Sequence, residues 1–396
     1  MSESSEPDLI TTPDALDDLL GHLRDARRFA FDTEFVSEET FEPILCLVQV
    51  ATAERQALID PLAFKNMQVF WDVVNDPGVE VVMHASGEDM RICQIQSGRL
   101  PERIVDVQIA SGLVGYGYPI SLGNLVRQEL GISLPGGETR TDWRRRPLTS
   151  AQLRYALDDV AHLLTLADKL GDRLAEWGRL EWSEGEYRER LRDIMALDDT
   201  ERWRKLPGLH HLSRRGLEIA RRLAEWRKND ARKTNQPLRR LMRDDLLVAI
   251  AKRHPSSRRD LEALREFNRP HLLAKAHEIL NVIAAAAAVP ADELPEHRER
   301  PDEGPGLSMV VSLLAATLNQ SCAQAKIATA LVGTNADLKH LVSWYADGCP
   351  DAQRPDLVRG WREELCGKTL LDVLSGRRAL RVVDPRADVP VALDPI

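Results

Sequence analysis

The chain has 396 residues, of which 43% are hydrophobic and 29% are charged, so it is long enough for two or three domains that each bury an apolar core. This composition excludes a fibre or a disordered tail, and the longest apolar run, 282–289, is far shorter than the roughly 20 residues of a membrane-spanning helix. The net charge of -9 argues weakly against a nucleic-acid partner, yet 201–265 holds 19 Lys or Arg against 8 Asp or Glu, which sets a basic module inside an acidic chain.

The cysteines and the first residues indicate a compartment. The 5 cysteines are scattered, without a C-x-x-C pair and without histidines at zinc-finger spacing. We therefore expect neither a disulfide framework nor a structural zinc site, which fits a reducing environment. The start, MSESSEPD, lacks the basic stretch and apolar core of a secretory signal, so we expect a cytoplasmic protein.

Apolar and aromatic runs broken by polar turns predict strands near the start of the chain. Helical patterns follow them. The predicted strands are 28–35, 44–52, 56–60 and 79–84, and the predicted helices are about 87–96, 121–130 and 150–170. Strands first, then strands alternating with helices, indicate an α/β fold in which helices cover a mixed sheet. We place this domain at 8–180.

Beyond Arg190 the strand signals vanish and helix-period patterns take over. A basic amphipathic helix at 213–229, followed by shorter helices, predicts a compact helical bundle over 205–288. The segment 289–306 is rich in proline and charge and is predicted to be a linker. A second small helical bundle is predicted at 307–380, and the last dozen residues show no usable pattern.

Two acids alternate on the first predicted strand, in the segment FDTEFV. A period of two places Asp32 and Glu34 on one face, about 7 Å apart along the strand. The alternate positions, Phe29, Phe31 and Phe35, indicate that the strand is buried on its other side. Two carboxylates so placed repel each other and are costly near a core unless cations neutralise them. On this segment alone, an exposed acidic strand end is the alternative.

Two later segments bring further acids. Asp89, in HASGEDM, falls in the first turn of a predicted helix, and on this segment alone the favoured interpretation is an acid that complements the helix dipole. In RYALDDV, Asp159 falls beside the apolar stripe of its helix, whereas Asp158 points to solvent. Tyr155 lies four residues before Asp159 on the same flank. Asp159 is therefore the functional candidate of the two.

The combination is more specific than any of its parts. Asp-x-Glu on a strand, Asp89 and Tyr-x-x-x-Asp on a later helix resemble the three motifs of the DEDDy 3′-to-5′ exonucleases. The segments ALIDPL, MHASGEDM, LGNLV, LGISL and ETRTDWRRRPL, in this order, are similar to those of the ribonuclease D family. The basic bundle resembles an HRDC domain, and 305–380 lies where that family has a second, more divergent one.

This resemblance implies a ribonuclease H-like sheet and a metal-dependent 3′-to-5′ exoribonuclease. Such an enzyme trims RNA 3′ ends, for example those of tRNA precursors, and releases nucleoside 5′-monophosphates. Four catalytic acids would hold two divalent cations, Mg²⁺ or Mn²⁺, which prefer hard oxygen ligands: Asp32, Glu34, Asp89 and Asp159. Tyr155 would be the fifth catalytic residue and would orient the attacking water.

Basic residues near the site and in the bundle are candidate nucleic-acid contacts. The loop ETRTDWRRRPL can grip phosphates and stack a base, although a plain solvated charge run is the alternative. The density of Lys and Arg in the bundle favours nucleic-acid binding there. The candidates are Arg140, Trp143, Arg144, Arg221, Arg227, Lys228, Arg232 and Lys233.

Two other functions stay open on the sequence alone. The first is a DNA exonuclease acting on single strands, because the same fold and acids serve DNA enzymes; a helicase is disfavoured because no Walker A pattern occurs. The second is a catalytically inactive nucleic-acid binding protein. The presence of all four acids and the tyrosine argues against it. The expected partner is RNA, and no membrane partner is expected.

Overall fold

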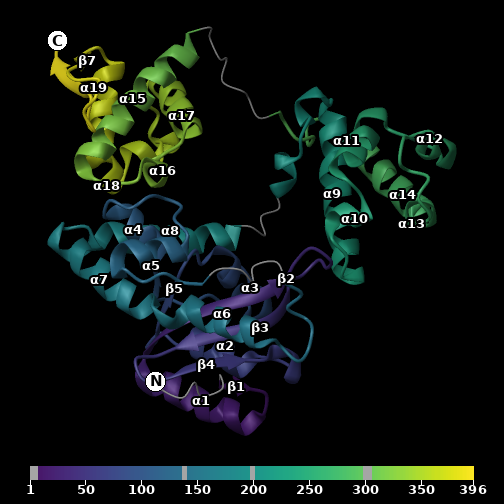
Figure 1. Ribbon diagram of the computed structural model, residues 1–396. Helices are drawn as coiled ribbons and strands as arrows, with labels where there is room; N and C mark the ends of the chain where they lie inside the picture. Colours follow the sequence, from purple (N-terminus) through teal and green to yellow (C-terminus); the bar gives the residue numbers. More distant parts are fainter. Residues whose placement is uncertain (1–7, 136–140, 197–200, 298–305) are drawn as a thin grey trace.

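The computed structural model describes residues 8–135, 141–196, 201–297 and 306–396 (Figure 1). They form a sheet domain, a basic helical module and a C-terminal bundle, each packed around its own hydrophobic cluster. In this described part of the chain, none of the helices combines the length and the apolarity that crossing a bilayer requires.

The sheet is mixed, as the sequence predicted, and has the order β1-β4-β3-β2-β5-β6. β3 pairs antiparallel with both β2 and β4, whereas β1–β4, β2–β5 and β5–β6 are parallel. β1 and β6 were not predicted because two or three residues are too few to display a period. The strands are β1 (Leu9–Ile10), β2 (Arg28–Val36), β3 (Ile44–Ala51), β4 (Gln56–Ile59), β5 (Glu80–Met83) and β6 (Ile104–Asp106).

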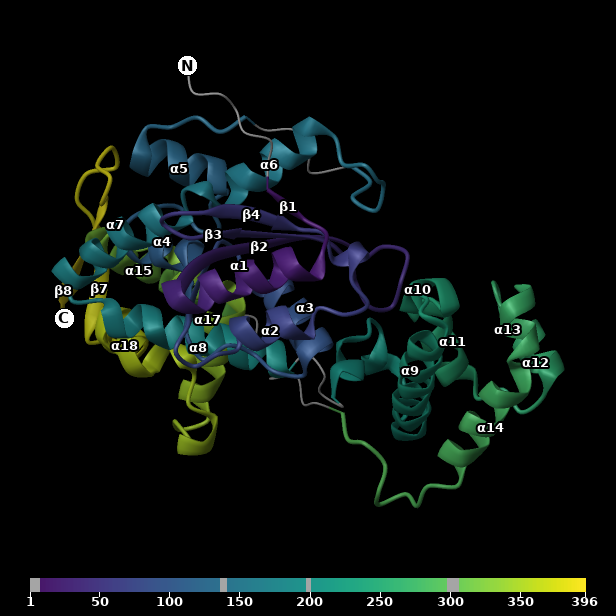
Figure 2. The same ribbon diagram turned by 90° about the horizontal axis from the view of Figure 1, so that it is seen from below.

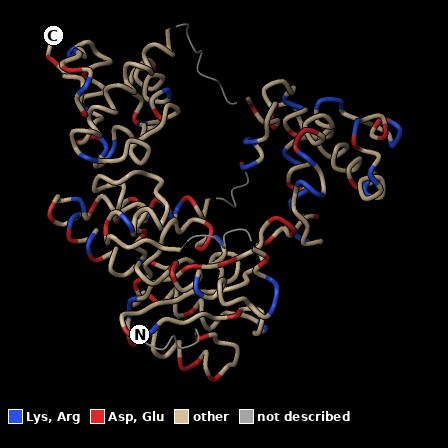
Figure 3. Tube along the Cα trace, viewed as in Figure 1, with Lys and Arg blue, Asp and Glu red and all other residues tan. Residues whose placement is uncertain are grey.

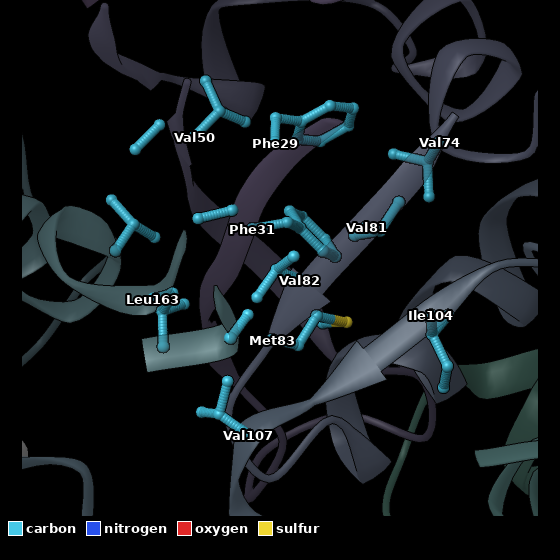
Figure 4. Packing of buried hydrophobic residues seen from close by; sticks show 14 of the residues in the cluster. Phe29, Phe31, Val50, Val74, Val81, Val82, Met83, Ile104, Val107 and Leu163 are labelled. Atoms are coloured by element: carbon cyan, nitrogen blue, oxygen red, sulfur yellow. The ribbon is translucent and has the colours of Figure 1, made fainter. Parts of the chain in front are cut away.

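Helices cover both faces of this sheet (Figure 2). On one face, Phe31 lies 5.7 Å from Phe70 and 6.0 Å from Trp71, centroid to centroid, and all three rings are buried. Figure 4 shows Phe31 among other buried residues of this core, including Val81 and Val82. The helices of the domain are α1 (Pro13–Ala26), η1 (Pro61–Ala63), α2 (Gln68–Val74), α3 (Gly87–Ser97), α4 (Val107–Leu113), α5 (Leu122–Leu130), α6 (Ser150–Ala161), α7 (Leu163–Glu176) and α8 (Leu180–Ala196).

The helix predicted at 150–170 is two helices, α6 and α7, which meet at His162. Its backbone, at φ -113° and ψ -1°, departs from helical geometry. The buried face of α6 is formed by Gln152, Ala156 and Val160. The sequence pattern predicts an apolar stripe at 153, 157, 160, 164 and 167, but Leu153 and Leu157 are only half-buried. The predicted stripe was off by about one position because one continuous period was drawn through the break.

The basic helical module lies to one side of the sheet domain in both views (Figure 1, Figure 2). Its long helix begins after Ser213, whose side chain accepts a hydrogen bond from the Gly216 N–H. The elements of the module are η2 (Arg202–Lys205), η3 (Leu209–His211), α9 (Arg214–Thr234), α10 (Leu238–Leu241), α11 (Asp244–Arg253), α12 (Arg258–Glu262), α13 (Pro270–Ala274) and α14 (Ala276–Ala287). Part of the predicted linker, 298–305, lies outside the described residues.

A small contact joins this module to the sheet domain. Asn235 ends α9 in the left-handed region, at φ 46°. Its Oδ1 accepts hydrogen bonds from the backbone N–H groups of Phe41, at 3.1 Å, and Glu42, at 3.3 Å. The Arg232 guanidinium lies 5.6 Å from the centre of the Phe41 ring. The connection between β2 and β3 therefore reaches the end of α9.

The C-terminal bundle docks on the sheet domain through partly buried groups. Trp182 on α8 stacks on Trp361, with ring centroids 5.1 Å apart. Arg362 donates to both carboxylate oxygens of Glu186, at 2.6 and 2.9 Å. The bundle consists of α15 (Leu307–Ala325), α16 (Thr329–Val332), α17 (Asn335–Ala346), η4 (Asp351–Gln353), η5 (Asp356–Val358), α18 (Gly360–Arg362), the π-helical turn Glu363–Gly367 and α19 (Lys368–Leu374).

The end of the chain forms an antiparallel hairpin, β7 (Arg378–Val382) with β8 (Val391–Pro395). The expectation that strands vanish beyond Arg190 is therefore wrong for this segment. Leu380 and Leu393 pack against the C-terminal bundle, while most of β7 is exposed. A strand with so little buried surface shows no clear alternation of apolar and polar residues, which is why no pattern was seen.

Candidate active site

β2 brings two acids to a partly open edge of the sheet. Asp32 and Glu34 share one face of the strand, and Phe29 and Phe31 fill the core on the other. β5 pairs only with residues 28–30 of β2, so β5 does not cover the edge beside the acids. α6 packs across the face that bears the acids. The two carboxylates thus lie between a sheet edge and a helix.

Asp89 reaches the same edge from the start of α3. Its side chain is 6% exposed, and the Thr33 hydroxyl donates a hydrogen bond to Oδ1. The backbone of Thr33 also hydrogen-bonds to this carboxylate. Thr33 was missed in the sequence because it alternates away from the two acids beside it. It attaches α3 to the acidic segment of β2.

α6 supplies the tyrosine and the fourth acid. The side chains of Tyr155 and Asp159 interact, and this interaction lowers the pKa of Asp159 against the larger effect of burial. The charge of Asp159 raises the pKa of both Asp32 and Glu34. Neither of these two acids is among the main causes of the pKa shift of Asp158. The structure therefore gathers the five predicted catalytic side chains in one place.

Burial and mutual repulsion dominate the electrostatics of this place. Desolvation first, and then the neighbouring acids, raise the pKa of Asp32 well above its ordinary value and the pKa of Glu34 to about 8. Burial is also the main reason that the pKa of Asp159 rises to about 7 and that of Asp89 to about 6. No Lys or Arg is among the main causes of the pKa shifts of these four carboxyl groups.

These carboxylates fit divalent cations by the chemistry of their donors. Hard oxygen ligands that repel one another in a desolvated place are stabilised by a cation such as Mg²⁺ or Mn²⁺. Within the described ranges, no three His, Cys, Asp or Glu side chains already form a metal-binding group. Mg²⁺ usually keeps several waters and uses one or two carboxylates together with substrate phosphates, so it does not require a closed protein cage.

Trp143 does not fit the predicted role of stacking a base. Its side chain is 3% exposed, and its ring lies 6.2 Å from the Tyr155 ring. It belongs to the apolar cluster between α6 and the sheet, which includes Leu47 and Ala156. The indole therefore supports Tyr155 from within the protein. Sequence reasoning missed this because the surrounding arginines suggested an exposed loop.

The arginines of the same loop are largely engaged. Arg144 forms ion pairs with Asp142, at 2.9 Å, and Glu39, at 2.5 Å. Arg145 keeps 85% of its side chain exposed and is the loop cation that solvent reaches best among those described. Arg140 lies outside the described residues.

The basic module divides its candidates into buried and exposed residues. Arg227 is 5% exposed and donates to the Asp244 carboxylate at 2.7 Å, so its guanidinium is buried in a structural ion pair and is not available to RNA. Arg221 is held by the buried Glu218. Lys228 is half-buried. Arg232 and Lys233 are exposed at the end of α9, and Lys and Arg recur along the rest of the module (Figure 3).

Comparison with known proteins gives consistent matches. Family models match a 3′-5′ exonuclease at residues 7–175, an HRDC domain at 216–283 and the C-terminal HRDC domain of ribonuclease D at 305–370. Ribonuclease D of Cronobacter turicensis is 32% identical over 92% of this chain and 99% of its own length. That of Gluconacetobacter diazotrophicus is 33% identical over 95% of each.

The same likeness holds in three dimensions. The crystal structure of Escherichia coli RNase D, described as an exoribonuclease involved in structured RNA processing, matches with a TM-score of 0.84 and 28% identity. The match covers 94% of this chain and 99% of that one. The catalytic core of RRP6 from Trypanosoma brucei, at 23% identity and a TM-score of 0.56, shares the fold.

The raised pKa of Glu34 predicts how the stability of the metal-free protein depends on pH. Between its ordinary pKa of 4.5 and the folded value of about 8, the folded state keeps a proton that the unfolded state releases. The free energy of unfolding therefore falls as pH rises through this window. In EDTA, we expect Glu34→Gln to raise the free energy of unfolding at pH 8 by on the order of 1–3 kcal/mol, with little change at pH 4.

Urea denaturation at the two pH values measures this effect. Glu54→Gln, at an exposed position, is the control and should change the free energy of unfolding little at either pH. If Glu34→Gln destabilised the protein at pH 8, burial and repulsion would not be raising the pKa of Glu34 in the folded state.

Proposed function

We propose, from the premise that the chain belongs to the ribonuclease D family, that its four acids and Tyr155 remove nucleotides one at a time from RNA 3′ ends. The chain is a 3′-to-5′ exoribonuclease, as its relatives and its exonuclease segment indicate. The products would be nucleoside 5′-monophosphates. The observation that carries the proposal is the group of four desolvated acids, whose pKa shifts have no Lys or Arg among their main causes.

Each acid has a distinct proposed role. Asp32, Glu34 and Asp159 would hold one divalent cation, and Asp32 would share a second with Asp89, which would act through water. When bound, two such cations, Mg²⁺ or Mn²⁺, supply positive charge to the attacking water and to the departing 3′-oxygen. Thr33 supports this arrangement by keeping the Asp89 carboxylate beside β2.

Tyr155 would orient the attacking water as a neutral phenol. Burial, and then the nearby carboxylates, raise the pKa of Tyr155 above its usual range, so the hydroxyl keeps its proton at neutral pH. A protonated phenol donates and accepts hydrogen bonds but is a poor base. Its present link to Asp159 holds the hydroxyl at the edge of the acidic group. We therefore assign it positioning of the nucleophile and not proton abstraction.

The substrate would be RNA with a single-stranded 3′ end beside structured regions, such as a tRNA precursor. The Escherichia coli relative is described as acting in structured RNA processing, which supports this choice. In the proposed division of labour, 8–180 performs catalysis, the HRDC-like module 205–288 holds RNA through exposed cations, and 307–380, after a linker at 289–306, is a second HRDC-like bundle.

Among the RNA contacts we retain Lys233 and Arg232, which are exposed, and leave out Arg227, which is buried.

A cytoplasmic location is supported by the cysteines, which are free thiols without disulfides.

The first test uses 5′-labelled single-stranded RNA, a tRNA precursor and single-stranded DNA, each with Mg²⁺, Mn²⁺ or EDTA. The unmodified protein should shorten RNA stepwise from the 3′ end in the presence of either metal. Asp32→Ala should abolish the reaction while the fold, followed by circular dichroism, is kept, because a shared ligand is lost. Hydrolysis that continues in EDTA would contradict the assignment, and a preference for DNA would favour the rival function.

The second test concerns Tyr155→Phe, which keeps the ring against Trp143 and removes only the hydroxyl. Groups that position a nucleophile or transfer protons contribute about 10²- to 10⁴-fold in rate. Single-turnover rates at saturating Mg²⁺ should fall by that order, while the RNA dissociation constant changes by less than about threefold. Asp158→Asn is the control on the same helix and should have a mild effect. A rate for Tyr155→Phe within about twofold of the unmodified protein would remove the phenol from the mechanism.

The third test concerns the basic module. Lys233→Ala combined with Arg239→Ala removes two exposed cations and should weaken RNA binding in EDTA. Each lost phosphate contact should lower the slope of log affinity against log salt by about 0.7 for a single strand. Arg24→Ala combined with Arg386→Ala, which are exposed elsewhere, is the charge-matched control. Equal slopes for the two double variants would show that the module does not contact RNA at these positions.

A further inference from the structure

β3 buries a carboxamide that has no hydrogen-bond partner. The Gln49 side chain is 0% exposed, and neither its Nε2 nor its Oε1 is hydrogen-bonded in the structure. Burying an unpaired amide disfavours folding, so most buried polar groups in proteins are paired. A leucine at this position would fill similar space without that cost. Because folding alone does not explain a glutamine at this position, we looked for a role of Gln49 in function.

The strand register places one polar side chain next to this amide. Gln49 pairs directly with Asp32 on one side and with Leu58 on the other. Directly opposite side chains in an antiparallel pair share a face, with Cβ atoms about 4.5–5.5 Å apart. The neighbours on the same face of β3, Leu47 and Ala51, are apolar. Among these register neighbours, Asp32 is the polar one.

α6 closes the space above this face. Leu47 and Leu58 pack with Ala156 of α6 and with Trp143 in a buried cluster. The face that bears Gln49 is thus covered mainly by apolar groups, with the buried and unpaired Nε1 of Trp143 as a polar exception. A glutamine side chain is long enough to span the distance to an opposing carboxylate. Water has little access, so a hydrogen bond formed here is stronger than one at the surface.

We propose that Gln49 is a positioning residue for Asp32: its Nε2–H donates to a carboxylate oxygen of Asp32 when that carboxylate holds a divalent cation. An amide suits this role because it stabilises an anionic carboxylate without bringing a positive charge that would compete with the cation. Groups that hydrogen-bond to metal ligands fix their orientation, and their loss typically costs 10- to 100-fold in metal affinity or activity. This inference rests on the proposed function of the four acids.

The experiment compares Gln49→Leu with the unmodified protein by two measurements that do not depend on turnover. The first is the urea midpoint in EDTA, and the second is Mn²⁺ affinity from electron paramagnetic resonance titration. We expect the midpoint to stay or rise, because an unpaired amide is removed. We expect Mn²⁺ affinity to fall by about 10- to 100-fold. Stability and metal binding should therefore move in opposite directions.

Two further variants sharpen the comparison. Gln49→Met keeps an unbranched side chain of similar length and should reproduce the loss of Mn²⁺ affinity, which separates the missing donor from a change of shape. Gln320→Leu replaces a buried glutamine of the C-terminal bundle and should leave Mn²⁺ affinity unchanged.

The remaining outcomes overturn the inference in distinguishable ways. If Asp32→Ala abolishes Mn²⁺ binding while Gln49→Leu binds it like the unmodified protein, Gln49 does not position Asp32 and the proposed function stands. If both Gln49 variants lower the urea midpoint, the amide has a structural role instead. If the unmodified protein shows no Mn²⁺ binding that depends on Asp32, the proposed function fails together with the inference.

Discussion

The sheet domain has to keep four desolvated, mutually repelling carboxyl groups close together. Asp32 and Glu34 come from β2, Asp89 from α3 and Asp159 from α6, so three separate elements must be held together against the charges that they share. The aromatic core on the opposite face of β2 supplies much of the opposing stabilisation, because large apolar areas are buried there.

The placement of Asp32 with Glu34 and most of the sheet could be predicted because both depend on local periods, whereas Asp89 was singled out through the resemblance to the exonuclease motifs. Alternation along β2 separates Asp32 and Glu34 from the phenylalanines, and this holds whatever the rest of the chain does. Contacts between distant segments left no such signal. The hydrogen bond from Thr33 to Asp89, the burial of Trp143 and the ion pair of Arg227 all depend on which elements pack together. An arginine in a basic run looks the same in the sequence whether it faces solvent or is buried beside an aspartate, as Arg227 is beside Asp244.

The two helical parts are attached to the sheet domain in different ways. The C-terminal bundle uses stacked tryptophans and the pair of Glu186 and Arg362, both largely removed from solvent. The module of α9–α14 uses the exposed amide of Asn235 and a cation over an aromatic ring. Interfaces of the second kind are small and polar, and relative motion across them is the ordinary expectation. The part that bears the exposed cations is thus the one with the lighter attachment.

The Asn235 contact also determines which substitutions the chain can accept there. Its partners are two backbone N–H groups, so the hydrogen bonds do not depend on which side chains follow at 41 and 42, and only proline, which lacks the N–H, would remove one. Asn235 itself combines a left-handed backbone with an acceptor oxygen, two demands that few residues meet together. These hydrogen bonds therefore tolerate most substitutions at 41 and 42, in the loop between β2 and β3. They tolerate few substitutions of Asn235 at the end of α9.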